Sequence, residues 1–141
     1  MRPQRSLADA LLPLLRERFP DRGLRENAAA EFCAIFPAAH GEVGDISIQD
    51  DGTELTVYVG NFTHLHFSYF ENDLSPEQKT RWIVEEVVQF LDYMFADRVI
   101  MWGSHRGGGG LSTEGAPGYA ELRSPRTRLE RYVWSGPLPR E

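Results

Sequence analysis

Residues 45–70 read DISIQDDGTELTVYVGNFTHLHFSYF, three runs in which apolar and polar residues alternate. Asp50-Asp51-Gly52 and Gly60-Asn61 separate the runs, and these residue types favour tight turns. Because a strand turns successive side chains to opposite faces, the pattern predicts an antiparallel meander with one apolar face. The apolar face would include Ile46, Val57 and Leu65.

The other face of the meander would carry hydroxyl, amide and aromatic side chains together with two histidines. His64 and His66 are separated by one residue, so both imidazoles leave the same face of their strand. With Tyr58 they suggest a recognition surface. The full set on this face is Ser47, Gln49, Thr56, Tyr58, His64, His66 and Ser68.

The two histidines also allow a second interpretation, a small metal-dependent hydrolase. Two imidazoles on one strand can bind one metal if a loop carrying His40 or His105 supplies a third nitrogen. No HExxH or CxxC motif accompanies them, and no nucleophile is evident, since Cys33 lies in a mostly apolar run typical of a core residue. We therefore assign no catalytic residue, metal ligand or cofactor, and favour a protein that is not an enzyme.

The most regular helical pattern follows the meander. Ser75-Pro76-Glu77-Gln78 combines an N-cap, a proline at the first helical position and a residue that can close a capping box, which predicts a helix from Ser75 to Asp97. Its apolar residues fall on one side and should pack on the apolar face of the meander. They are Ile83, Val84, Val87, Val88, Phe90, Leu91, Met94 and Phe95.

A second stripe on this helix lies away from the apolar side. Trp82, Glu86, Gln89 and Tyr93 are spaced i, i+4, i+7 and i+11. Two large aromatics flanking a carboxylate are typical of a binding hot spot, so Trp82, Glu86 and Tyr93 are candidate contacts. The alternative is that the C-terminal residues Tyr132 and Trp134, or a dimer partner, cover the stripe.

The rest of the chain gives weaker signals. A helix should start at the N-cap Ser6 and run towards Phe19, with Pro13 as a possible kink. Residues 28–36 fit a helix or a strand, and their alternation favours the strand. Strands are expected at 98–102 and 129–134. The glycine-rich segment 103–118 is expected to be a flexible loop.

Length and composition indicate one globular domain over residues 1–141. The chain is 41% hydrophobic and 26% charged, and no apolar run approaches the roughly 20 residues of a membrane span. Charged residues follow the first apolar stretch at once, which disfavours a secretory signal. The single Cys33 cannot form an internal disulfide, so a cytoplasmic location is expected.

Charge is concentrated in the middle of the sequence. Residues 42–97 hold two basic and twelve acidic residues, whereas residues 98–141 hold seven basic and four acidic ones. An acidic centre repels phosphate, which disfavours nucleic acid and favours a partner protein with a basic surface. The alternative is that the acidic residues only keep the domain soluble.

Residues 44–102 resemble small uncharacterised bacterial proteins, a resemblance that implies no particular activity. The order of helix, three strands, long helix and further strands is similar to that of type III secretion chaperones. Those are dimers that hold an unfolded segment of an effector on apolar patches, so this likeness implies a homodimer.

The expected fold is α+β, a two-layer domain with a mainly antiparallel sheet of four to six strands, one long helix on a face and an N-terminal helix. The expected function is non-catalytic protein binding, as an immunity-like inhibitor or an adaptor with an acidic, aromatic-bearing surface. A metal-dependent hydrolase using His64 and His66 and a secretion-chaperone-like dimer are the alternatives.

Overall fold

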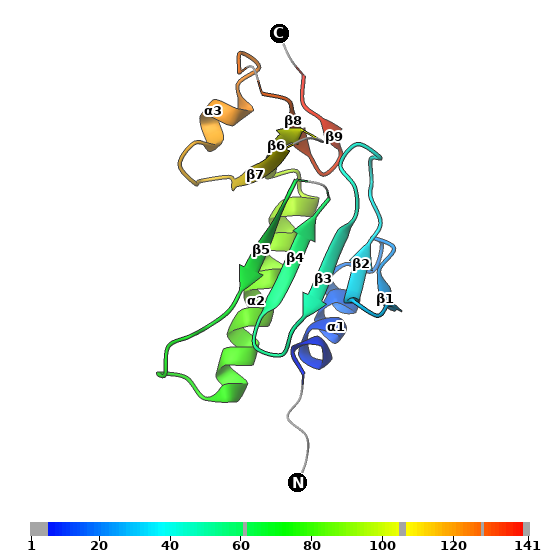
Figure 1. Ribbon diagram of the computed structural model, residues 1–141, viewed down its shortest axis with the longest axis vertical. Coiled ribbons are helices and arrows are strands. Elements are labelled where there is room, and N and C mark those ends of the chain that lie inside the picture. Colours follow the sequence, from blue (N-terminus) through cyan, green and yellow to red (C-terminus); the bar gives the residue numbers. More distant parts are fainter. Residues whose placement is uncertain (1–5, 61, 105–106, 128, 140–141) are drawn as a thin grey trace.

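The computed structural model describes residues 6–60, 62–104, 107–127 and 129–139. A five-stranded antiparallel sheet carries helices on one face, and a second, four-stranded sheet lies at its end (Figure 1). This confirms the predicted α+β class; the second sheet was not predicted. No helix formed by the described residues is long and apolar enough to cross a membrane. The elements are α1 (Leu7–Arg18), β1 (Arg25–Ala29), β2 (Phe32–Phe36), β3 (Ile46–Asp50), β4 (Leu55–Val59), β5 (Thr63–Phe67), α2 (Pro76–Phe95), β6 (Val99–Ser104), β7 (Gly107–Thr113), α3 (Tyr119–Arg123), β8 (Arg131–Val133) and β9 (Gly136–Pro137).

Both predicted helices begin at the expected caps. The Ser6 hydroxyl accepts from the Asp9 N–H at 3.1 Å. At the start of α2 the capping box is complete: the Gln78 N–H donates to Ser75 Oγ at 3.2 Å, and the Ser75 N–H donates to Gln78 Oε1 at 2.9 Å. These bonds satisfy donors that have no partner within a first helical turn. α1 runs through Pro13, and α2 ends at Phe95, two residues before the expected Asp97.

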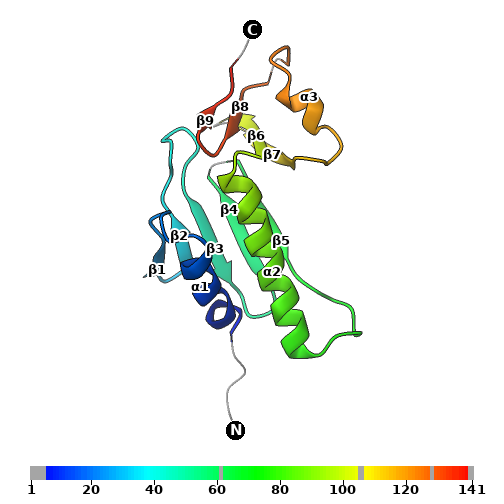
Figure 2. The same cartoon turned by 180° about the vertical axis from the view of Figure 1, so that it is seen from behind.

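The first sheet has the order β1-β2-β3-β4-β5, and each neighbouring pair is antiparallel. Val57 pairs with Ile48 on one side and with Leu65 on the other, so the predicted meander is correct. Its apolar face is covered by α1 and α2 (Figure 2). The residues with no exposed surface on β3 and β4 are Ile46, Ile48, Leu55, Val57 and Val59. Burying each such side chain contributes roughly 1.5–3 kcal/mol before chain entropy is subtracted.

Residues 28–36 form parts of two strands. The alanine run ends β1, residues 30–31 turn, and β2 follows. The preference for a strand was correct for Phe32–Phe36, which form β2. Ala34 and Phe36 of this strand are fully buried in the core. β1 is irregular: its register shifts between Glu26 and Ala29, and Asn27 lies between them with a φ of 51°.

The second sheet has the order β7-β6-β8-β9 and contains both strands expected in the C-terminal third. The expected loop at 103–118 is wrong over β7, where the glycines pair with β6. A Cβ on Gly109 would lie 2.0 Å from Trp102 O, and one on Gly110 would lie 2.5 Å from the Trp102 ring. Glycine is therefore required here by close approach of Trp102.

Candidate functional site

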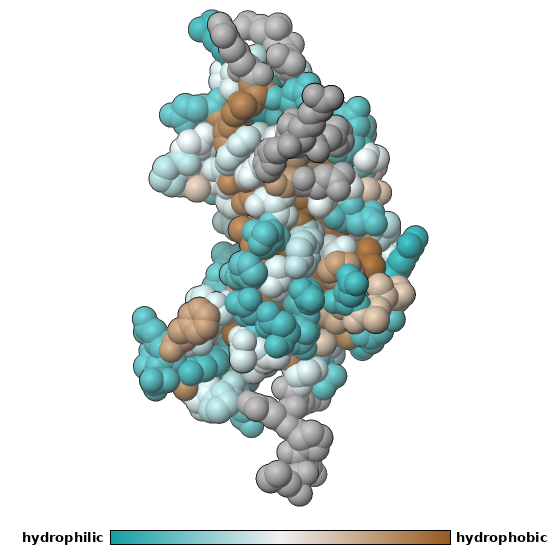
Figure 3. Space-filling view, in the orientation of Figure 1, coloured by the Kyte–Doolittle hydropathy of each residue, from teal (hydrophilic) through white to brown (hydrophobic). Residues whose placement is uncertain are grey.

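The strongest candidate site is the face of the first sheet opposite the helices. Figure 1 shows this face uncovered, and hydrophilic side chains gather over its β3–β5 part (Figure 3). Tyr58 pairs with His64 across the strands, and their rings lie 5.5 Å apart. The His64 and His66 rings meet edge to face at 5.0 Å. The structure thus brings together the three residues predicted on this face, here called the open sheet face.

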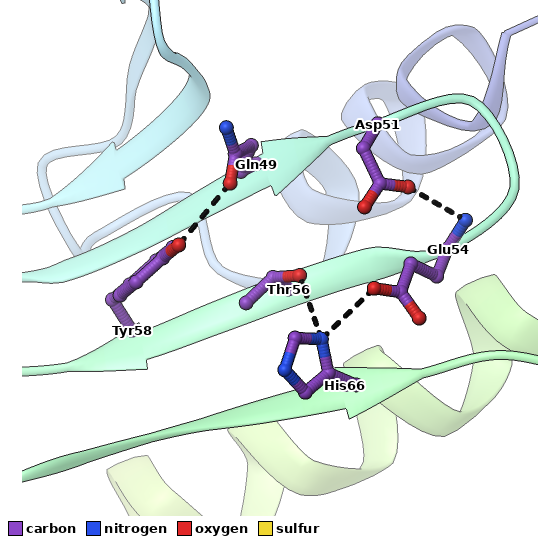
Figure 4. Close-up of polar contacts among 6 residues, drawn as sticks. All are labelled: Gln49, Asp51, Glu54, Thr56, Tyr58 and His66. Atoms are coloured by element: carbon purple, nitrogen blue, oxygen red, sulfur yellow. Dashed lines mark hydrogen bonds and ion pairs between the residues drawn. The ribbon is translucent and has the colours of Figure 1, made fainter.

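Hydrogen bonds across the strands hold two of these side chains, His66 and Tyr58, in place (Figure 4). Nδ1 of His66 lies 2.9 Å from Glu54 Oε1 and 3.1 Å from Thr56 Oγ1. The Tyr58 hydroxyl donates to Gln49 Oε1 at 3.2 Å. Side chains already fixed in one rotamer lose less entropy when a partner binds. These bonds therefore reduce the entropy that the two side chains would lose in any contact.

The described residues of this face do not form a set of ligands for a metal ion. They contain no group of three or more His, Cys, Asp or Glu side chains able to hold a metal ion. His40 has other neighbours: its Nδ1 accepts from the Glu42 N–H at 3.2 Å, and a Cβ on Gly136 would lie 2.9 Å from its ring. The other suggested third ligand, His105, lies outside the described residues.

Cys33 has the environment of a packed thiol. It is half-buried at the edge of the core, with Sγ 3.5 Å from the carbonyl of Ile48. Burial, followed by the negative charge of Asp50, raises the pKa of the thiol to about 11. A catalytic cysteine needs the opposite shift, because the thiolate is the nucleophile. The arrangement fits the structural role expected for Cys33.

The predicted helix stripe is divided into separate contacts. Trp82 is 39% exposed and meets Tyr69 edge-on at 5.1 Å. Tyr93 is half-buried, with the guanidinium of Arg98 4.3 Å from its ring. Glu86, between them along α2, is also partly exposed. Tyr132 and Trp134, suggested as a cover for this stripe, instead pack against Phe62 and Phe95, with ring centroids 5.0 and 5.2 Å apart.

One surface was not found from the sequence, a groove of about 500 Å³ between α1 and α2. Leu14, 39% exposed, and the partly buried Val88 provide its apolar part. Arg18 and Asp92 bridge it with hydrogen bonds of 3.0 and 2.8 Å. The exposed Leu14 on the first helix could have indicated an apolar surface, but it did not identify which helix lies beside it. The lining is Leu14, Glu17, Arg18, Glu85, Val88, Gln89 and Asp92.

The structure is a small α+β domain in which one face of the first sheet is not covered by any helix of the described residues. Comparisons with protein-family models, curated proteins and solved structures give no match for this chain.

Proposed function

We propose that this chain is a non-catalytic protein-binding domain, an immunity-like inhibitor or an adaptor, and that it binds its partner at the open sheet face. The observation that carries the proposal is the cluster of the Tyr58, His64 and His66 rings on a face that no described helix covers. Aromatic side chains held rigidly contribute most strongly to protein interfaces, because little entropy is lost when they are buried.

The charge distribution supports a partner with a basic surface. The acidic excess lies in residues 42–97, the segment that contains β3, β4, β5 and α2. Glu54 lies beside His66 on the open sheet face itself. Opposite charges on two partners accelerate their encounter and orient them before contact. Association with such a partner should therefore slow as salt concentration rises.

The observations give the hydrolase alternative less support. Its two histidines have no third ligand among the described residues, and burial disfavours the thiolate of Cys33. The chaperone-like dimer is a separate alternative, and sedimentation of the purified protein at several concentrations would test it.

The proposal can be tested by finding a partner and then measuring the affinity of purified components. The test variant is the double substitution Tyr58→Ala and His64→Ala, and the control is Leu14→Ala, which removes an exposed apolar side chain from the helical layer. We expect the double variant to weaken binding at least roughly tenfold and the control to bind normally. A partner bound equally well by both variants would refute the proposed site.

A further inference from the structure

The two edge strands of the first sheet differ in how they are protected. β1 carries charged residues, a register shift and a residue with positive φ, and Glu26 is paired with Arg16 of α1 at 2.7 Å. Bulges and charges are the usual devices that prevent another strand from pairing with a sheet edge. β1 is therefore a blocked edge.

β5, at the opposite edge, has no bulge, no charged residue and no proline, and β7 (Gly107–Thr113) of the second sheet lies close to it. Its sequence Thr-His-Leu-His-Phe contains no Lys, Arg, Asp, Glu or Pro. It pairs with β4 in five consecutive register positions without a shift. Among the described residues, no backbone bond other than those to β4 reaches Thr63–Phe67. Its outer N–H and C=O groups therefore have no backbone partner in the part of the chain that the structure describes, and an extended backbone is the structure that matches their spacing.

The two groups of side chains predicted as binding residues flank this edge. His64 and His66 leave β5 on the open sheet face. Behind β5 lies α2, where Phe90 packs on Phe67 with ring centroids 5.8 Å apart. A strand added to β5 would therefore run between the two histidines and α2.

Three residues of the predicted helix stripe lie on the part of α2 turned away from α1, whereas the fourth, Gln89, lines the groove with α1. Asp92 faces α1, where it pairs with Arg18. At about 100° per residue, Glu86 and Tyr93 point about 120° and 100° away from Asp92, towards the side on which Phe90 meets β5. Trp82 is on that side as well, since it contacts Tyr69, two residues after the end of β5.

The shape and charge around β5 fit a short segment of a partner. In Figure 3 the margin of the molecule is hollowed at the level of β5, between the second sheet and the loop of residues 68–75. That loop presents Phe70, which is 81% exposed, and the acidic residues Glu71 and Asp73. An apolar and basic segment would complement these groups.

We propose that β5 accepts an extended, basic segment of a partner protein as an additional strand of the sheet. Alternate side chains of this segment contact His64 and His66 on one face and Trp82, Glu86 and Tyr93 on the other. The inference deepens the proposed protein-binding function, because it specifies the conformation and charge of the bound segment. Backbone hydrogen bonds provide affinity, and the two rows of side chains provide selectivity.

Synthetic peptides test this directly. The probes are four eight-residue peptides in which Lys alternates with Val, Ile, Phe or Tyr, and each has a control that is N-methylated at every second residue along one edge. N-methylation removes backbone donors without changing charge. We expect at least one probe to bind the full chain and its methylated control to bind about 10- to 100-fold more weakly, from loss of several hydrogen bonds. No binding, or equal binding of probe and control, would overturn the proposal.

Two further measurements locate the peptide. Hydrogen exchange should slow at amides of β5 and not at those of β1. Trp82→Ala should weaken peptide binding roughly tenfold. Leu14→Ala should leave it unchanged, because Leu14 belongs to α1, on the other side of α2 from β5. Exchange protection of β5 that rises with protein concentration in the absence of peptide would identify a second copy as the occupant and overturn the proposal. Binding of a partner protein could be lost on substitution of Tyr58 while that partner leaves hydrogen exchange at the β5 amides unchanged. That result would refute strand addition and leave the proposed binding function intact.

Discussion

The carboxylate of Asp50 accepts a hydrogen bond from the backbone N–H of Ala8, 42 positions away in the chain, at 2.9 Å. Its other oxygen accepts from the Gly52 N–H at 2.9 Å, within the β3–β4 turn. One side chain therefore closes the turn and also caps the first turn of α1. A negative charge at a helix N-terminus lowers the free energy of the folded state, so this contact stabilises the packing of α1 on the sheet.

Replacing Asp50 with alanine should reduce the free energy of unfolding by about 1–2 kcal/mol, since both the cap and the charge at the helix N-terminus are lost. Urea denaturation followed by circular dichroism measures this loss. Asp51→Ala is the matched control, because within the described ranges the Asp51 carboxylate accepts only from the Glu54 N–H of the same turn, at 3.0 Å. A control variant as unstable as Asp50→Ala would show that the turn, and not the contact with α1, is responsible.

Gly109→Ala and Gly110→Ala should each destabilise the second sheet by about 1–3 kcal/mol, because the added methyl group overpacks against Trp102. Gly41→Ala is the control, since a Cβ there meets no atom within 4 Å. Thermal unfolding and Trp fluorescence would record the effect. Tolerance of alanine at both positions would mean that the β6–β7 pair is looser than its geometry indicates.

Arg131 is 2% exposed, and its guanidinium donates to the carbonyls of Leu122 and Pro139 at 2.6 and 2.5 Å. It thereby joins α3 and the C-terminal segment to β8. Arg131→Met should cost about 2–4 kcal/mol, because two carbonyls lose charged donors. Faster tryptic cleavage within residues 107–139 would be the signature. Arg123→Met, which removes an exposed arginine bonded to the Tyr119 hydroxyl at 3.0 Å, should have a much smaller effect.

The thiol of Cys33 should react slowly with iodoacetamide at pH 8. A pKa raised from 9.0 to about 11 lowers the thiolate fraction, roughly 100-fold at that pH. The rate should keep rising up to about pH 11, whereas a short peptide containing Cys33 should level off about two units earlier. A plateau of the folded protein near pH 9 would contradict this environment.

The same pKa shift links Cys33 to stability at high pH. The folded state holds the thiol proton more tightly than the unfolded state, so the stabilising contribution is complete below about pH 9 and is lost as pH rises towards 11. Cys33→Ala should remove this part of the pH dependence between pH 9 and 11 in urea denaturation. An unchanged pH profile would assign the dependence to other groups.

The predictions from sequence succeeded where the signal was local and repeated. The alternation around Val57 and the capping residues at Ser75 each act within a few positions, so they could be interpreted without knowledge of the fold. The prediction failed at Gly109 and Gly110, because their partner is Trp102 on the neighbouring strand. When its surroundings are unknown, a glycine run is interpreted as a flexible backbone. The same glycines can instead be needed because they leave room for a side chain that packs over them.

The candidate site shows the same division. The HxH spacing placed His64 and His66 on one face, and the stacking of Tyr58 on His64 followed from the register of adjacent strands. The groove at Leu14 and the contact between Trp82 and Tyr69 depend on which elements become neighbours. The spacing of residues within one helix or strand does not show which other element will lie beside it.

Side-chain periodicity, turn residues and helix caps were enough to establish the meander, the long helix and the face that each buries. They act over a few residues, and their energies do not depend on distant parts of the chain. The position of β5 at one edge of the sheet, the position of α2 behind it and the bond from Ala8 to Asp50 arose from folding as a whole. These contacts join residues far apart in the chain, and packing of the complete core selects among them.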